Sequence, residues 1–121
     1  MIPLIKKLLC DAIRSGTYKQ NKGYLRGPDQ TFCVMGVLCE LYRNNIHNAP
    51  QWTQIGNGAT YGGRFITLPS EIEIWSGLEF DKLPNPVMGT TEPMRASLAL
   101  SHLNDTGYSF EDLAVFIENH L

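Results

Sequence analysis

The segment Arg14–Tyr42 joins a basic loop directly to an almost wholly apolar stretch. Its second part, Phe32–Tyr42, has apolar residues on nearly every side, which is typical of a buried helix or a buried strand. We favour a helix because the run continues for eleven residues. Gly36 would weaken that helix by about 1 kcal/mol relative to alanine. We therefore expect another backbone to approach Gly36 closely.

Apolar residues at helical spacing predict further helices at both ends of the chain. The first covers Pro3–Ser15, where proline suits the opening turn and Gly16 suits the end. A second covers Met94–Leu103. The last is opened by Ser109, whose side chain would form a capping box with Asp112.

The remaining elements are shorter. Trp52–Ile55 and Arg64–Leu68 predict two strands of a loose hairpin around the glycine-rich segment Gly56–Gly63. Tyr24–Arg26, between two turn signals, would form another short strand.

A short helix is predicted to start after Ser70, with Glu73 completing a capping box and Gly77 ending it. Prolines predict a loop over residues 78–93. These are Pro84, Pro86 and Pro93. Together the patterns predict an α+β fold, mainly helical, with four to five helices and a small antiparallel hairpin or sheet.

Length and charge narrow the class of protein. The 121 residues predict a single globular domain over 1–121. The net charge of −2 hides an asymmetry, because residues 1–70 carry +5 and residues 71–121 carry −7. The halves either form two electrostatic faces or neutralise one another when packed. A binder of duplex DNA is normally net basic, so that class is not expected.

Neither a signal peptide nor a membrane span is expected from the sequence. No apolar run approaches the roughly 20 residues needed to cross a bilayer, so we expect no membrane contact. Lys6 and Lys7 interrupt the apolar N-terminal stretch, and we interpret it as mature structure. The cysteines are odd in number, which favours reduced thiols in the cytoplasm. They are Cys10, Cys33 and Cys39.

The first candidate site is the set of cationic, aromatic and amide side chains in the loop. These residues are Arg14, Tyr18, Lys19, Gln20, Lys22, Tyr24 and Arg26. Arginine offers a planar fork for phosphate, lysine a compact charge, and tyrosine a face on which a base stacks. Asn104 and Asp105 would add ribose or amide contacts if the last two helices pack beside the loop. The alternative is a solvated loop whose tyrosines seal the edge of the core.

The second candidate is a cysteine nucleophile. Cys33 would lie in the first turn of its helix, where the helix dipole lowers a thiol pKa. His102, with Asn104 and Asp105 nearby, or His47 would be the base. No peptidase signature surrounds Cys33, and a buried apolar role is the commoner one for such a cysteine.

Three other motifs do not predict a functional site, because their residue spacing or their charge does not match the pattern that such a site requires. The cysteines and histidines show no CxxC, HxxxH or HExxH spacing, so no metal site is predicted. Gly56–Gly63 lacks the phosphate-loop arrangement and is interpreted as a flexible hairpin tip. The helix pair in Met94–Leu121 resembles a helix-turn-helix, but its last helix is acidic and phosphates would repel it.

Four motifs extend over nearly the whole chain: RSGxYKQxxGxLR, FCxxGVLCxLY, LPxxIxxWxGL and LNDxGxSFxxLAxxIE. They resemble a group of short phage and prophage proteins, mostly described as hypothetical. Val34 and Met35 stand where that pattern has Cys and Leu. The matching residues are Arg14–Gly16, Tyr18–Gln20, Gly23, Leu25, Arg26, Phe32, Cys33, Gly36–Cys39, Leu68, Pro69, Trp75–Leu78, Leu103–Asp105, Gly107, Ser109 and Phe110.

The resemblance implies a phage accessory protein, with counter-defence as one such role, in the cytoplasm of the host cell. With the basic loop, this predicts binding of a nucleotide-like anionic small molecule or a host protein, without catalysis or a cofactor. A homodimer is compatible with the sequence. One alternative is a hydrolase or transferase that uses Cys33. Another is a structural or regulatory protein that acts through its acidic C-terminal half.

Overall fold

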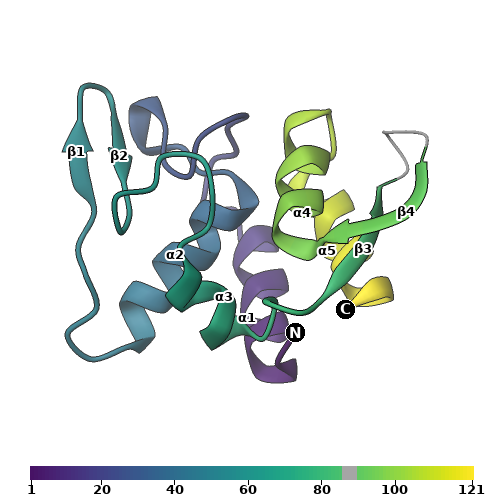
Figure 1. Cartoon of the computed structure of the whole chain (residues 1–121). Coiled ribbons are helices and arrows are strands. Elements are labelled where there is room, and N and C mark those ends of the chain that lie inside the picture. Colours follow the sequence, from purple (N-terminus) through teal and green to yellow (C-terminus); the bar gives the residue numbers. More distant parts are fainter. Residues whose placement is uncertain (86–89) are drawn as a thin grey trace.

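The computed structural model describes residues 1–85 and 90–121. Within these ranges the chain is an α+β protein, mainly helical. Its helices are α1 (Pro3–Arg14), α2 (Val34–Asn45), α3 (Ser70–Ser76), α4 (Ala96–Asp105) and α5 (Phe110–His120), with a 3₁₀ turn at Pro28–Gln30. Its strands are β1 (Thr53–Ile55), β2 (Gly58–Thr60), β3 (Lys82–Asn85) and β4 (Thr90–Arg95). The hairpins β1–β2 and β3–β4 lie on opposite sides of the helices (Figure 1).

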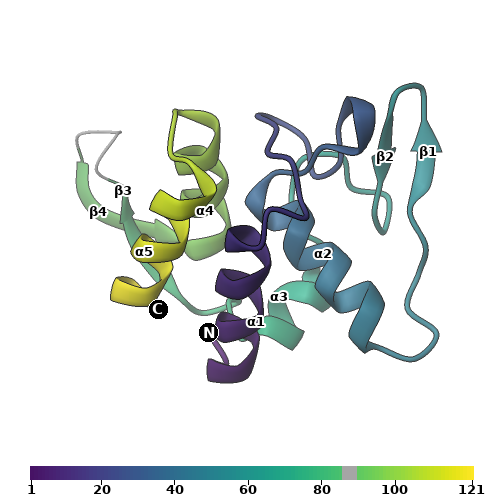
Figure 2. The same ribbon diagram turned by 180° about the vertical axis from the view of Figure 1, so that it is seen from behind.

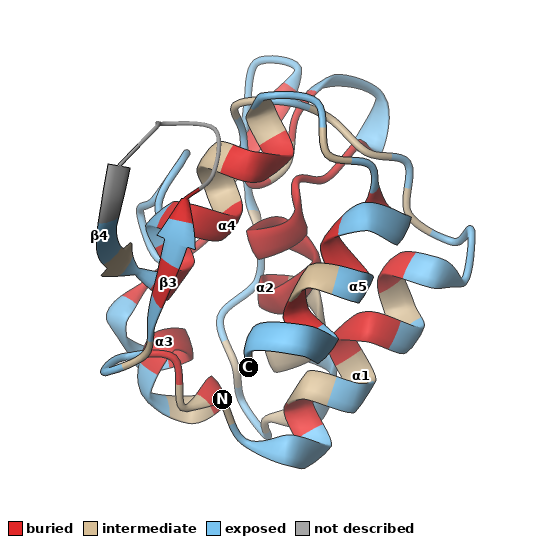
Figure 3. Cartoon of the chain, turned by 90° about the vertical axis from the view of Figure 1, so that its right-hand side faces the viewer, coloured by how far each residue is buried: buried red, intermediate tan, exposed pale blue. Residues whose placement is uncertain are grey.

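Helix α2 is the centre of the core. Its first six residues, Val34–Cys39, are all buried, and Figure 3 shows this part of α2 enclosed among the other helices. Helices α1 and α4 pack against α2, and α5 packs beside α1, as the view from behind shows (Figure 2). The predicted buried helix is confirmed, although it begins two residues later and ends at Asn45.

The predicted close approach at Gly36 is also confirmed. An ideal Cβ built on Gly36 would lie only 1.7 Å from the carbonyl oxygen of Leu25. The missing side chain therefore lets the segment before Arg26 lie directly on α2. Glycine is required here by backbone contact and not by its own φ angle.

The helix ends follow the sequence signals in two places. Gly16 adopts φ +79° directly after the end of α1. Ser109 and Asp112 form the predicted capping box, with 3.1 Å between Asp112 N and Ser109 Oγ and 3.1 Å between Ser109 N and Asp112 Oδ2. These ends are set by local chemistry. None of the helices in the described part of the chain is long and apolar enough to span a membrane.

The first hairpin differs from the prediction. Strand β1 pairs with β2 inside the glycine-rich segment, so that Ile55 lies opposite Gly58. Arg64–Leu68 forms no strand, and only a bridge joins Arg64 to Tyr61. The chain reverses earlier than expected because Gly56, at φ +57°, allows a tight turn. Tyr24–Arg26 is likewise no strand, although Arg26 makes isolated bridges to Phe32 and Ala59.

The loop predicted over residues 78–93 holds for 78–81 and is wrong for 82–85 and 90–93, where β3 and β4 pair with each other. Burial alternates along β3, where Leu83 and Asn85 are buried and Pro84 is exposed. A two-stranded sheet has only edge strands, in which a proline without an N–H is tolerated. Pro93 lies in β4 for the same reason, and Pro86 falls outside the described residues.

The capping box predicted at Ser70 is wrong as well. Ser70 is the first residue of α3, Pro69 occupies the N-cap position, and no side-chain cap forms. The Glu73 carboxylate is buried and accepts hydrogen bonds from Arg95 Nη2 (2.6 Å) and Ser97 Oγ (2.5 Å). A charged partner from a distant segment outcompetes the local cap. Gly77 ends α3 at φ +77°, as predicted.

Candidate ligand-binding pocket

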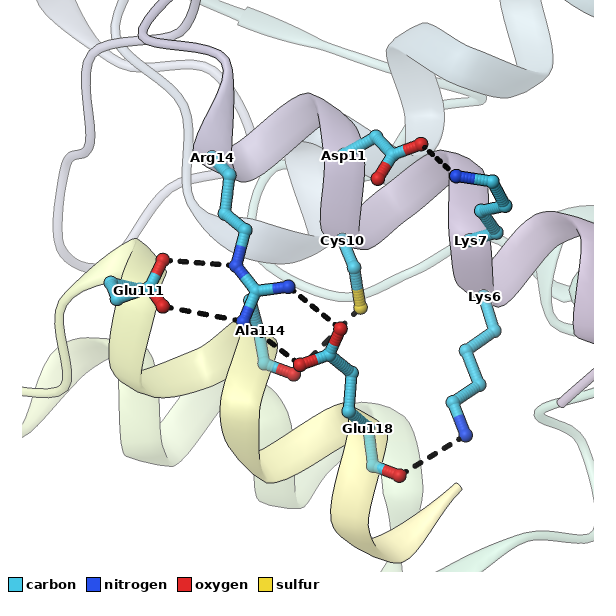
Figure 4. A network of polar contacts seen from close by, with 8 residues as sticks. All are labelled: Lys6, Lys7, Cys10, Asp11, Arg14, Glu111, Ala114 and Glu118. Atoms are coloured by element: carbon cyan, nitrogen blue, oxygen red, sulfur yellow. Dashed lines mark hydrogen bonds and ion pairs between the residues drawn. The ribbon is translucent and has the colours of Figure 1, made fainter.

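Arg14 is held by carboxylates from the acidic half of the chain (Figure 4). Its guanidinium donates to Glu111 at 2.9 and 3.2 Å and to Glu118 at 2.6 and 2.8 Å. These hydrogen bonds raise the pKa of Arg14. Here the basic and acidic halves neutralise one another, and Arg14 ties α1 to α5.

Asn104 is a fully buried junction between the loop and two helices. Its Oδ1 accepts from Val34 N (3.1 Å) and Gln20 Nε2 (2.9 Å), and its Nδ2 donates to Asn21 O (2.8 Å). Cys33, the N-cap residue of α2, supplies no side-chain cap. Asn104 therefore satisfies the first backbone N–H of α2 from outside that helix.

Gln20 and Asp105 complete the same junction. Gln20 Oε1 accepts from Phe110 N at 3.1 Å, and Asp105 Oδ1 accepts from Gly23 N at 2.8 Å. The last two helices do pack beside the loop, as the sequence argument required. The polar groups of Gln20, Asn104 and Asp105 are committed to holding the loop in place.

Two of the predicted residues, Tyr18 and Arg26, line a pocket of about 500 Å³. It is bounded by the loop, the exposed side of α2 and the segment before β1. We call it the Arg26 pocket. Its lining residues are Thr17, Tyr18, Arg26, Gln30, Phe32, Glu40, Arg43, Gln51 and Trp52.

The other loop residues lie outside this pocket. Lys19 and Lys22 are exposed and form no ion pair within residues 1–85 and 90–121. Tyr24 packs edge-on against Phe65, with 5.3 Å between the ring centroids. The structure therefore does not gather all the predicted residues into one place.

The Arg26 guanidinium lies over two aromatic rings. Its central carbon is 5.7 Å from the ring centroids of both Phe32 and Trp52, within the range of cation–π interactions. No carboxylate of the described chain forms an ion pair with Arg26. Arg14 and Arg43, in contrast, each have a carboxylate partner. Arg26 thus presents a positive charge beside two aromatic rings, and that charge also helps to lower the pKa of the Glu40 carboxyl in the same pocket.

Glu40 lines the same pocket and anchors the indole ring of Trp52. It accepts from Arg43 Nη2 at 2.6 Å and from Trp52 Nε1 at 2.6 Å. Burial raises the pKa of the Glu40 carboxyl, but the hydrogen bonds from Arg43 and Trp52 outweigh burial and hold it below its ordinary value. The ionised carboxylate therefore holds the indole ring of Trp52 in a fixed orientation.

Edge-on contacts between aromatic rings stiffen the wall. Phe32 contacts Tyr18 at a centroid distance of 5.3 Å and Trp52 at 6.0 Å. Trp52 in turn contacts the buried ring of Tyr61 at 5.1 Å. Such pairs prefer edge-to-face geometry and restrict ring rotation.

Sequence reasoning did not identify the other seven lining residues as part of a site, and four of these make the contacts described above: Phe32, Glu40, Arg43 and Trp52. The available signals were a glutamate and an arginine three residues apart on an otherwise apolar helix, and a tryptophan at the start of a predicted strand. Each of these signals is common by itself. Only the folded chain brings them together.

Cys33 and His102 do not form a catalytic pair. Burial raises the pKa of the Cys33 thiol to about 11, opposite to the lowering expected from a helix dipole. His102 Nδ1 lies 2.8 Å from Asn85 Nδ2, and in the described part of the chain no hydrogen bond joins it to Cys33. His47 is exposed after the end of α2. No group of three metal-ligating side chains was found among the described residues.

A family model described as a domain of unknown function, DUF8296, matches residues 1–121. The chain belongs to this family. No curated protein and no solved structure matches it. The description of DUF8296 assigns no activity, so the function must be inferred from the geometry of the pocket.

Proposed function

We propose that the protein binds a nucleotide-like anion in the Arg26 pocket and does not transform it. The observation that carries this proposal is the unpaired Arg26 guanidinium above the rings of Phe32 and Trp52. A nucleotide offers a flat base for the aromatic wall and a phosphate for the arginine fork. The pocket volume of about 500 Å³ is within the range of small-molecule sites.

The lining chemistry supports binding over catalysis. The described residues that line the Arg26 pocket include no cysteine and no histidine. The carboxylate of Glu40 is committed to Arg43 and Trp52. A general base needs a free lone pair aimed at its substrate, and Glu40 is poorly placed to provide one.

The setting we propose is the cytoplasm of a phage-infected host cell. Its support is the resemblance to phage and prophage proteins, together with three free cysteines, which suit a reducing compartment. There, a binding protein would act by sequestering an anionic metabolite, for example one that a host defence depends on.

Calorimetric titration with a panel of nucleoside mono- and triphosphates tests the proposal. We expect at least one member of the panel to bind, and Arg26→Gln to weaken it roughly tenfold or more, because hydrogen bonds to charged groups contribute about 1.5–3 kcal/mol. Arg14→Gln is the matched control and should leave the affinity unchanged. If no nucleotide binds, or if both variants weaken binding equally, the proposal fails.

A protein partner is the second candidate, favoured by one observation. The Phe80 side chain is 85% exposed, and aromatic side chains are enriched at protein–protein interfaces. We expect a host protein to be retained by the wild type and lost with Phe80→Ser. Ile55→Ser, which changes a residue that is 50% exposed on β1, serves as the control. Equal retention by wild type and Phe80→Ser would reject this candidate.

A further inference from the structure

The Arg26 pocket adjoins a second hollow of about 340 Å³. Arg26 and Gln30 line both, so the arginine stands at the boundary between them. The residues lining the second hollow are Arg26, Gly27, Pro28, Asp29, Gln30, Gln54, Asn57 and Gly58. A ligand held by Arg26 therefore has space on both sides of the guanidinium.

The two hollows differ in chemistry. The first has three aromatic rings, whereas the second has no aromatic ring and is lined by polar residues that include Gln54, Asn57 and Asp29. Gln54 Nε2 donates to Gly56 O at 2.9 Å, so its amide oxygen is the group left for a ligand hydroxyl. Amides and a carboxylate pair well with hydroxyl groups, and the negative charge of Asp29 disfavours a phosphate deep inside. The anion would then be held at Arg26, between a stacked ring and a hydroxyl-bearing group.

The turn that separates the hollows has an unusual backbone. Asp29 and Gln30, which are not glycines, have φ values of +57° and +56°. The turn is held by the hydrogen bonds Gly27 N to Thr31 O (2.9 Å) and Thr31 Oγ1 to Pro28 O (2.8 Å). Backbone conformations that cost free energy persist where the surroundings enforce them, and they cluster at ligand sites.

The hairpin β1–β2 is fastened to the same residue. Ala59 N donates to Arg26 O at 3.1 Å, and a Cβ on Gly58 would lie 3.0 Å from that oxygen. The main chain of Arg26 is thus fixed by β2 while its side chain faces the rings. Arg26 is therefore a fixed boundary that the two hollows share.

From the adjacency of these two hollows we infer that the ligand is two-headed, meaning that its phosphate joins a base-bearing group to a second, hydroxyl-rich group. This inference rests on the proposed function. A planar base occupies the Arg26 pocket, a phosphate lies at Arg26, and a second ribose or sugar occupies the hollow lined by Gln54 and Asn57. The class is a nucleotide whose phosphate carries a further hydroxyl-rich group. Dinucleotides and nucleoside diphosphate sugars both share this chemistry.

The test is calorimetric titration of matched one-headed and two-headed ligands. AMP is compared with the dinucleotide ApA, and UDP with UDP-glucose, which separates the two sources of the second head. We expect one two-headed ligand to bind at least tenfold tighter than its one-headed match. The double variant Gln54→Ala/Asn57→Ala should remove that gain and leave the one-headed affinity unchanged.

Two controls keep the outcomes distinct. Asn119→Ala, which removes an exposed amide from α5, should change neither affinity, and circular dichroism checks that each variant is folded.

If one- and two-headed ligands bind equally well, the two-headed inference is overturned while the proposed function stands. If a tenfold gain survives in the double variant, the second head lies elsewhere and the inference is also overturned. If no ligand binds, both the two-headed inference and the proposed function are overturned.

Discussion

Replacing Gly36 by alanine should destabilise this protein, although the same change stabilises most helices. In an ordinary helix interior the substitution gains about 1 kcal/mol. Here the new Cβ would lie 1.7 Å from Leu25 O and 2.6 Å from Leu25 C. Both contacts are with backbone, so no side-chain rotation can relieve them.

The magnitude follows from these distances. The Leu25 carbonyl would have to retreat by about 1.3 Å to reach the 3.0 Å that real Cβ atoms keep. Overpacking of a core typically costs about 1–3 kcal/mol, and a clash with backbone belongs at the upper end of that range. After subtracting the helical gain, we expect a loss of about 2 kcal/mol or more in the free energy of unfolding. For a chain of this size that is a fall in Tm of roughly 6–12 °C.

Urea and thermal unfolding followed by circular dichroism measure this loss. Asn44→Ala, at an exposed position of the same helix, is the matched control and should be neutral or slightly stabilising. Because Leu25 precedes Arg26, Gly36→Ala should also weaken ligand binding. A variant as stable as the wild type would show that α2 and the loop do not touch at this point.

Three further predictions concern stability. Asn104→Ala should cost about 2–4 kcal/mol, because it leaves buried groups such as Val34 N without a partner; a loss below 1 kcal/mol in urea unfolding would contradict the junction. Tyr61→Phe should stabilise the protein by about 1 kcal/mol, since among the described residues the buried Tyr61 hydroxyl has no hydrogen-bond partner, and a lower Tm would argue against this. With a Cys33 pKa of about 11 in the fold and 9.0 as its ordinary value, the thiol ionises first in the unfolded chain. The free energy of unfolding should therefore fall as the pH rises from about 9 to 11. Cys33→Ala should make this dependence shallower, the remaining slope coming from Cys10 and Cys39, whose thiol pKa values burial also raises, and an unchanged slope would refute the assignment.

Much of the helical framework could be predicted from the sequence because its signals are local. The capping box at Ser109, the turn at Gly16 and the close approach at Gly36 all follow from single residues in a periodic pattern. The β3–β4 hairpin could not be predicted, because Pro84 and Pro93 argue against strands unless both strands are known to be edges. Glu73 was assigned to a local cap because its partner, Arg95, lies 22 residues away.

The candidate site was predictable only in part. Tyr18 and Arg26 were found because cations and rings alternate within one loop. Trp52 and Glu40 come from other segments and converge only in the folded chain. Arg14 carries the same charge as Arg26, and no local feature indicates that Glu111 and Glu118 neutralise it.

The junction at Asn104 has a consequence for synthesis. The loop that carries Arg26 and the start of α2 both depend on a side chain encoded about seventy residues later, since Val34 and Asn104 are separated by 70 positions. On the ribosome, the N-terminal half must wait until α4 has emerged before its loop can be locked. Formation of the Arg26 pocket is thereby coupled to the synthesis of α4, and a truncated translation product that ends before α4 should lack an ordered pocket.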